Sequence, residues 1–243
     1  MRGNLSQGAH YLIRGAGLLR HKSLRLFVII PLAINIVIFA SLIGIVLHYL
    51  IDLMDHWLGM IPQWLGFIQW ILWPLIGLTL SLMTGYAFTA LALLIASPFN
   101  ALLAEKAEEL ITGRPVDSLE GFAAALAAIP RGIIRELVKL LYYIPMFVLV
   151  LILSFVPVLN TVAPFLWLLL GAWMMSIQFL DYPMDNHQLS FADVKEAARY
   201  RRLTSLGFGG AVALCASIPV VNFFVIPAAV VGATIMWSEE LQE

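Results

Sequence analysis

The chain has 243 residues, of which 61% are hydrophobic and only 12% are charged. A soluble domain carries about 25% charged residues, so this composition excludes an ordinary soluble protein and indicates an integral membrane protein. Lipid offers no water to backbone groups, and the alternating pattern of a transmembrane barrel is absent, so we expect an all-α membrane protein. The net charge of −1 identifies no partner. The single cysteine, Cys215, leaves no pair for an intrachain disulfide.

The basic residues are distributed unevenly. All 14 Lys and Arg residues fall within residues 2–25, 106–139 and 195–202, and the apolar runs between these clusters contain none. By the positive-inside rule we expect the N-terminus and the three basic clusters on the cytoplasmic side. The first apolar run is too long for a signal peptide and is not followed by a small-residue cleavage site. We therefore treat residues 1–243 as a single multi-pass membrane domain.

Residues 4–22 predict an amphipathic helix. Leu5, Leu12, Ile13 and Leu19 share one face at helical spacing, and Arg14 lies off that face. A helix of this kind prefers to lie in the membrane interface.

The basic end of this segment meets the first apolar helix at Ser23-Leu24-Arg25, with Arg20 and Lys22 just upstream. We expect the helix to begin at about Leu26. A helix start offers unpaired N–H groups and the positive end of the dipole, so Arg25 there predicts a site for a small oxyanion. The alternative is that these cations only anchor the helix on the cytoplasmic side, and local features alone favour the anchor.

Two full transmembrane helices are predicted, over residues 26–51 and 73–96, each at least as long as the ~20 residues that cross a bilayer. Asn35 is the notable polar residue in the first. It either makes a helix–helix hydrogen bond or belongs to a transport pathway. Residues 97–139 predict cytoplasmic helices, the first beginning with Ser97 as N-cap and Pro98 at the first helical position. This segment also contains Asn100, Glu105 and Glu108.

Arg131, Arg135 and Lys139 lie on one helical face at intervals of four residues. The simplest interpretation is a face turned to solvent or lipid headgroups. The alternative is that Arg131 or Arg135 pairs with Glu105 or Glu108 to form a polar vestibule.

Residues 140–180 and 203–237 predict two helical hairpins, which turn at Pro157–Asn160 and at Pro219–Asn222. The halves of the second are about 15 residues, or about 22 Å, whereas the hydrocarbon core is about 30 Å thick. We therefore expect partly inserted, re-entrant hairpins. Irregular backbone at membrane depth must be buried in protein or face water, which favours an oligomer or a water-filled path. Between the hairpins, residues 181–187 predict a polar turn, and Ser190 with Asp193 predicts a helix cap.

Several motifs together resemble the CysZ-type sulfate permeases of bacteria over essentially the whole chain. The resemblance rests on Ser23-Leu24-Arg25 leading into Phe27-Val28-Ile29-Ile30-Pro31-Leu32 with Asn35, on Ser97-Pro98-Phe99-Asn100-Ala101-Leu102-Leu103-Ala104-Glu105, on Ala163-Pro164 with Ala172-Trp173-Met174, and on Asp181-Tyr182-Pro183-Met184-Asp185-Asn186-His187.

The resemblance implies a protein of the bacterial inner membrane that imports sulfate for cysteine synthesis. It also implies two long transmembrane helices with two partly inserted hairpins, assembled as a homo-oligomer. The family's sulfate motif, Gly-Leu-Arg, matches Ser23-Leu24-Arg25 here, so sulfate is the expected ligand of those residues. Candidate pathway or gating residues are Arg20, Lys22, Asn35, Asn100, Glu105, Glu108, Arg131 and Arg135.

The residues allow three functions. A channel-like or gradient-driven sulfate route follows by elimination, because the sequence holds no phosphate-binding loop for ATP and no carboxylate inside its apolar runs. A membrane scaffold that binds partners through its basic loops is the alternative. An enzyme is not expected, since the five histidines are scattered and hydrolase and kinase motifs are missing. We expect sulfate and membrane lipids as partners, and no metal, cofactor or nucleic acid.

Overall fold

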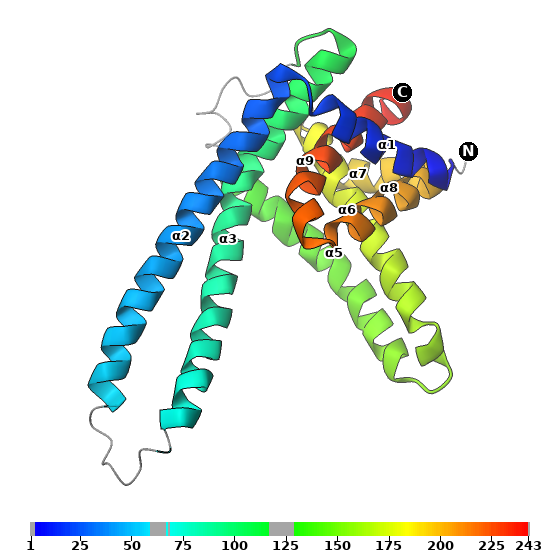
Figure 1. Ribbon diagram of the computed structural model, residues 1–243. Helices are drawn as coiled ribbons and strands as arrows, with labels where there is room; N and C mark the ends of the chain where they lie inside the picture. Colours follow the sequence, from blue (N-terminus) through cyan, green and yellow to red (C-terminus); the bar gives the residue numbers. More distant parts are fainter. Residues whose placement is uncertain (1–2, 59–66, 68, 117–128, 243) are drawn as a thin grey trace. The chain divides into compact units, whose positions relative to one another are not determined.

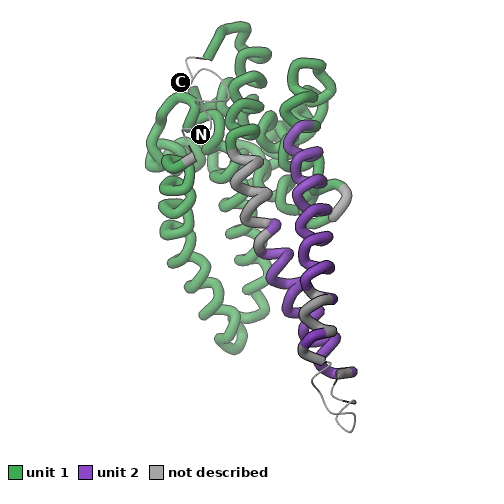
Figure 2. Tube along the Cα trace, turned by 90° about the vertical axis from the view of Figure 1, so that its left-hand side faces the viewer, with its two compact units in different colours: residues 1–29, 97–243 green, residues 30–96 purple. Residues whose placement is uncertain are grey.

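The computed structural model describes residues 3–58, 67, 69–116 and 129–242. Across these residues the backbone is helical and contains no strand, as predicted. The chain divides into two compact units (Figure 2): unit 1 is Met1–Ile29 with Ser97–Glu243, and unit 2 is Ile30–Ala96.

Unit 2 contains most of the two longest helices. Helix α2 is Lys22–Leu58 and helix α3 is Gln69–Thr112. Within unit 2 they contact each other through the rings of Phe39 and Phe88, whose centroids are 4.5 Å apart. The apolar part of α2, Lys22–Tyr49, is long and apolar enough to cross a membrane and covers most of the first predicted span.

Both helices differ from the prediction at their boundaries. Helix α2 begins at Lys22 rather than at about Leu26, because the amide of Leu24 already donates to the carbonyl of His21. Helix α3 continues through Ser97 and Pro98, so the predicted helix start there is wrong. Proline has a helical φ and removes only one backbone hydrogen bond, so a long helix can continue through it.

Helix α1, Leu5–Leu18, has the predicted amphipathic character. Asn4 caps its start by accepting from the amide of Ser6. The buried face of α1 packs on α8 (Arg202–Ala216) and α9 (Pro219–Met236) of unit 1 and holds Gly8, Tyr11, Leu12 and Gly15.

The C-terminal turn, η3 at Trp237–Leu241, contacts the polar side of α1. The Tyr11 hydroxyl donates to Glu240 Oε1 at 2.8 Å, and Arg14 Nη2 lies 2.6 Å from Glu239 Oε1. Burial, followed by this hydrogen bond to Glu240, raises the pKa of Tyr11 well above its usual value. Tyr11 therefore stays a neutral donor, and the contact joins the two ends of the described chain.

Two helices and a short turn occupy the region of the first predicted hairpin. It consists of α5, Ile129–Phe155, a short 3₁₀ turn, η2, at Leu159–Thr161, and α6, Ala163–Asn186. Its turn includes Val158, whose φ of 73° is a left-handed conformation that costs a β-branched residue energy. The turn lies at the opposite end of unit 1 from the C-terminus (Figure 1).

The polar turn predicted at residues 181–187 is instead the last part of α6, which continues to Asn186. Asp181 and Asp185 are four residues apart and therefore share one face of this helix. Ion pairs with cations of α5 stabilise them there. The chain leaves the helix after Asn186, and Gln188 adopts a positive φ.

The second hairpin follows a short helix, α7, Phe191–Tyr200, which begins with the predicted Ser190–Asp193 capping box. Helix α8 is Arg202–Ala216, α9 is Pro219–Met236, and a π-helical turn, η3, is Trp237–Leu241. The hairpin turns at Ser217 and Ile218 rather than over residues 219–222, because Pro219 is accommodated at the start of α9.

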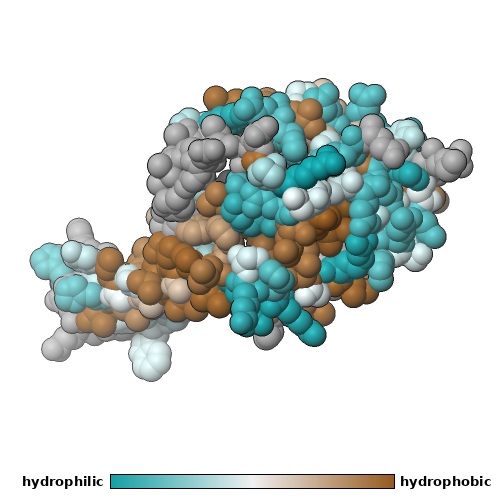
Figure 3. Space-filling view, turned by 90° about the horizontal axis from the view of Figure 1, so that it is seen from above, coloured by the Kyte–Doolittle hydropathy of each residue, from teal (hydrophilic) through white to brown (hydrophobic). Residues whose placement is uncertain are grey.

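Four described helices are long and apolar enough to cross a membrane: Lys22–Tyr49, Pro130–Phe155, Ala163–Asn186 and Val221–Leu241. Apolar side chains on α5 are widely exposed, including Leu141 at 68% and Phe155 at 82%. Viewed from above (Figure 3), hydrophilic residues gather on the end of unit 1 that carries α1 and the C-terminal turn. This distribution fits a multi-pass membrane protein.

Candidate functional site

The connection between α1 and α2 forms a tight basic turn. Backbone hydrogen bonds run from Arg20 to Gly17 at 3.3 Å and from His21 to Leu18 at 2.9 Å. The first residues of α2 follow at once, and a 2.6 Å hydrogen bond joins His21 Nδ1 and Ser23 Oγ. Ser23-Leu24-Arg25 therefore lies within the first turn of α2 and not ahead of it.

Leu24 fixes this turn to the rest of unit 1. Its side chain is completely buried in the hydrophobic core, together with Tyr11 and Leu12 of α1. By contrast, its neighbours Lys22, Ser23 and Arg25 are exposed. Leu24 thus anchors the first turn of α2 in the core, while the residues on either side of it face outward.

The exposed side of the turn presents several hydrogen-bond donors. Of the first four amides of α2, that of Leu24 donates to His21 O at 3.2 Å. No bond to a backbone acceptor outside α2 is present for the amides of Lys22 and Ser23 among the residues that the structure describes. Arg25 Nε donates to the carbonyl of Arg20 at 3.1 Å, which holds the guanidinium beside the turn. Unpaired amides with adjacent cations are the donor set that an oxyanion requires.

The other candidate residues lie elsewhere. The Asn35 Oδ1 atom, in unit 2, is buried and has no hydrogen-bond partner among the described residues. In unit 1, Asn100 Nδ2 donates to the Tyr182 hydroxyl at 3.3 Å. Glu105 lies 3.4 Å from Lys106, whose pKa is raised mainly by its hydrogen bond to Glu109.

Glu108 has a more central position than the sequence suggested. Its Oε1 atom accepts from His187 Nε2 at 2.8 Å and from Gln242 Nε2 at 2.9 Å, although its carboxylate is almost completely buried. These contacts join the end of α3, the end of α6 and the C-terminal turn. Glu108 lines a cavity of about 420 Å³ together with Thr112, Arg114, Pro115, Val116, His187 and Gln242.

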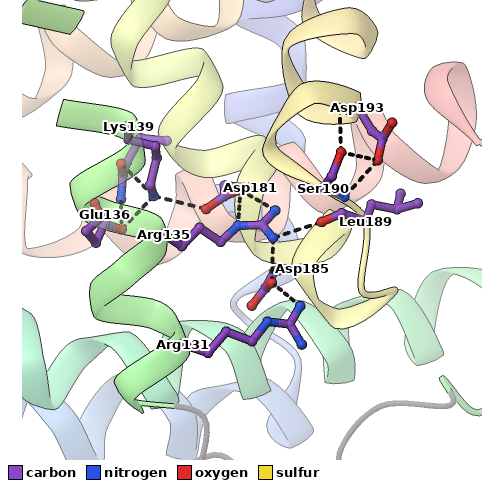
Figure 4. Close-up of polar contacts among 10 residues, drawn as sticks. Arg131, Arg135, Glu136, Lys139, Asp181, Asp185, Leu189, Ser190 and Asp193 are labelled. Carbon is purple, nitrogen blue, oxygen red and sulfur yellow. Dashed lines mark hydrogen bonds and ion pairs between the residues drawn. The ribbon is translucent and has the colours of Figure 1, made fainter. Parts of the chain in front are cut away.

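The proposed pairing of Arg131 or Arg135 with Glu105 or Glu108 is wrong. Arg131 Nη2 lies 2.7 Å from Asp185 Oδ1, and Arg135 Nη2 lies 2.6 Å from Asp181 Oδ1. The stripe on α5 therefore faces α6 of the same hairpin and not α3. Figure 4 shows the resulting hairpin cluster, which consists of Arg131, Arg135, Glu136, Lys139, Asp181 and Asp185.

The hairpin cluster was missed by sequence reasoning. Lys139 is only 2% exposed and pairs with Asp181 Oδ2 at 3.0 Å and with Glu136 on its own helix. A signal for the pairing was present, because α5 repeats its cations every four residues and α6 has carboxylates four residues apart. The equal spacing makes the basic face of α5 and the acidic face of α6 complementary. Only the register of the hairpin shows that these two faces meet.

Comparison with known proteins agrees with the resemblance seen in the motifs. The family model described as "Sulfate transporter CysZ/Etoposide-induced protein 2.4" matches residues 11–227. A protein named sulfate transporter CysZ from Pseudomonas fluorescens is 45% identical over 96% of this chain and 93% of its own length. Proteins of the same name from Pseudomonas aeruginosa and Vibrio parahaemolyticus are 42% and 39% identical, over 96% and 97% of this chain and 95% of their own lengths. The chain therefore belongs to the family of sulfate transporter CysZ and etoposide-induced protein 2.4.

Proposed function

We propose that this protein carries sulfate across the bacterial inner membrane and supplies it to cysteine biosynthesis. The route is channel-like or driven by an ion gradient, with an oxyanion site at Ser23, Leu24 and Arg25. Relatives that are 39–45% identical over nearly the whole chain are named as sulfate transporters, which supports the substrate. The observation that carries the site is the set of unpaired amides at the start of α2 beside the exposed Arg25.

The chemistry of sulfate matches this donor set. Removing a doubly charged ion from water costs a great deal of free energy unless hydrogen bonds and positive charge replace its hydration. The α2 amides supply donors without a side-chain entropy cost, and the planar guanidinium of Arg25 suits two oxygens of one anion. Arg20 and Lys22 add positive potential that attracts anions to the site.

Sulfate uptake into liposomes that contain only this protein is the direct test. We expect radiolabelled sulfate to accumulate faster than in protein-free liposomes, and an excess of unlabelled sulfate to suppress the signal. Uptake at the protein-free rate, with protein that is folded by circular dichroism, would instead support the scaffold function. In that alternative, the basic loops bind partner proteins and the buried polar groups are structural.

Arg25→Ala should weaken equilibrium sulfate binding by about 10- to 100-fold, because a hydrogen bond to a charged group contributes about 1.5–3 kcal/mol. Arg25→Lys should lie in between, since the ammonium keeps the charge and loses the planar fork. Isothermal titration of the detergent-solubilised protein measures both variants.

Arg199→Ala is the matched control for Arg25→Ala. It removes an exposed arginine from α7, whose carbonyl and not its side chain accepts the hydrogen bond from Arg202. We expect sulfate affinity to remain unchanged in this variant. An Arg25→Ala protein that keeps the wild-type affinity would place the sulfate site elsewhere.

The topology is also a proposal. Helix α8 has 15 residues and is therefore about 22 Å long, which is shorter than a hydrocarbon core of about 30 Å. This length supports partly inserted hairpins, with the N-terminus and basic clusters in the cytoplasm and with a homo-oligomer that shields the hairpins. Arg20, Lys22, Asn35, Asn100, Glu105, Glu108, Arg131 and Arg135 are the candidate pathway or gating residues. Those that contact the transported ion have a pathway role, and the others have a packing role.

A further inference from the structure

One carboxylate of the hairpin cluster occupies an unusual position. Asp185 Oδ1 lies 2.7 Å from Arg131 Nη2 and 2.7 Å from Arg135 Nη1 (Figure 4). A single oxygen is thus shared by two guanidinium groups that come from successive turns of α5. Paired guanidinium groups are also how proteins bind free oxyanions such as phosphate and sulfate.

The rest of the cluster holds Arg135 in place without Asp185. Arg135 Nη1 also donates to the Leu189 carbonyl at 2.8 Å, and Arg135 Nη2 pairs with Asp181 at 2.6 Å. The buried Lys139 pairs with Glu136 and with Asp181. With Asp185 present, three cations face three carboxylates, and without it the cluster carries one excess positive charge.

Of the two carboxylates that pair with the arginines, Asp185 is the one that a solute can reach. Its side chain is 32% exposed, compared with 8% for Asp181, and Arg131 is 45% exposed. Asp185 also lies in the last turn of α6, which ends at Asn186. A change of its side-chain rotamer can therefore release both arginines while the hairpin backbone stays in place.

We propose that Arg131 and Arg135 form a second oxyanion site, and that the carboxylate of Asp185 is its tethered competitor. A sulfate ion takes the place of Asp185 on the two arginines, so that the site is closed to dilute anion and opens as Asp185 turns away. This inference rests on the proposed function, because it assumes that the protein handles sulfate. A tethered group competes at an effective concentration in the millimolar range or above, so the site binds sulfate weakly while Asp185 is present.

The test uses the full-length protein with the first site removed. In an Arg25→Ala background, we expect Asp185→Ala to tighten sulfate binding at least tenfold, as measured by isothermal titration with sodium sulfate. Addition of Arg131→Ala to that protein should abolish the gain. Selenate, which has the same shape and charge, should compete for the new site, whereas chloride at equal ionic strength should not.

Glu109→Ala in the Arg25→Ala background is the matched control. It also removes one partly exposed carboxylate from an ion pair, here with Lys106, and makes the same change in net charge. Equal sulfate affinity in the Asp185→Ala and Glu109→Ala proteins would overturn the second site and leave Asp185 a structural ion pair. If the Asp185→Ala protein does not fold, Asp185→Ser replaces it in the same titration.

The same titrations separate the two proposals. An Arg25→Ala protein that binds sulfate like the wild type contradicts the first site, whatever Asp185→Ala does. A gain on Asp185→Ala that persists after Arg131→Ala contradicts the second site alone.

Discussion

Asp181→Ala should lower the free energy of unfolding by about 3–5 kcal/mol, which is the cost of removing one partner from a buried ion pair. Asp181 is shared by two cations, Arg135 at 2.6 Å and Lys139 at 3.0 Å, and its side chain is 8% exposed. Lys139, at 2% exposure, would keep only Glu136 and the amide oxygen of Gln178. A buried ammonium with incomplete compensation destabilises the folded state, so the α5–α6 hairpin should separate first.

Thermal unfolding of the purified protein in one detergent, followed by circular dichroism, measures this effect. Asp185→Ala is the matched control, because it removes a carboxylate from the same cluster at a half-exposed position. We expect Asp185→Ala to cost no more than about 1 kcal/mol, as is usual for ion pairs in contact with water.

A second change distinguishes lost charge compensation from lost packing. Lys139→Met removes the buried cation and keeps an unbranched apolar side chain of similar length. The double variant Lys139→Met, Asp181→Ala should be more stable than Asp181→Ala alone, since no uncompensated ammonium remains. Equal unfolding temperatures for Asp181→Ala and Asp185→Ala would show that the buried cations do not depend on Asp181.

Much of the architecture could be predicted from composition and charge. Long apolar runs without Lys or Arg predicted the long helices. Two further apolar runs, each divided near its middle by a proline, indicated both hairpins. Three of the errors in element assignment lie at proline. Pro98 lies inside α3, Pro183 lies inside α6, and Pro219 begins α9, although each had been assigned to a helix start or a turn. Proline's φ is helical in all three positions, so its presence alone does not decide between a break and a continuation.

The candidate sites differ in how much of each could be predicted from the sequence. Arg25 can be recognised in the sequence as a basic residue at a helix start. An oxyanion site could therefore be predicted there from the properties of helix N-termini. The pairing of Lys139 with Asp181 joins residues 42 positions apart on two helices, since 181 minus 139 is 42. Opposite charges were also available on α3, and nothing local excluded Glu105 or Glu108 as partners. Only the register of the hairpin places Asp181 and Asp185 against the cations of α5.

The glycines of α8 illustrate the same limit for packing. Gly207, Gly209 and Gly210 are close together in a helix, and all three look alike as small residues. In the structure, a Cβ atom added at Gly209 would overlap the carbonyl oxygen of Ala172 on α6 and lie 2.7 Å from the amide nitrogen of Ser176. At Gly210 the added Cβ would meet only the Ala172 Cβ, at an ordinary 3.7 Å. Adjacent glycines therefore have different roles, which only the helix crossing reveals.

Gly209→Ala should destabilise the protein by about 3 kcal/mol, at the upper end of the range for an overpacked core. The atoms that it meets belong to the backbone of α6, so no side chain can rotate away and the two helices must separate. Gly210→Ala adds the same methyl group one residue later and gains helix propensity of about 1 kcal/mol. We expect this control to be neutral or stabilising.

The pair is compared by unfolding temperature in one detergent, with sulfate binding as a second measurement. Because α8 also packs on α1, which leads into the Arg25 turn, separation of α6 from α8 should loosen the oxyanion site as well. Gly209→Ala should therefore unfold at lower temperature and bind sulfate more weakly than Gly210→Ala. If both variants unfold at the same temperature, the close approach of α6 and α8 at Gly209 is not a property of the folded protein.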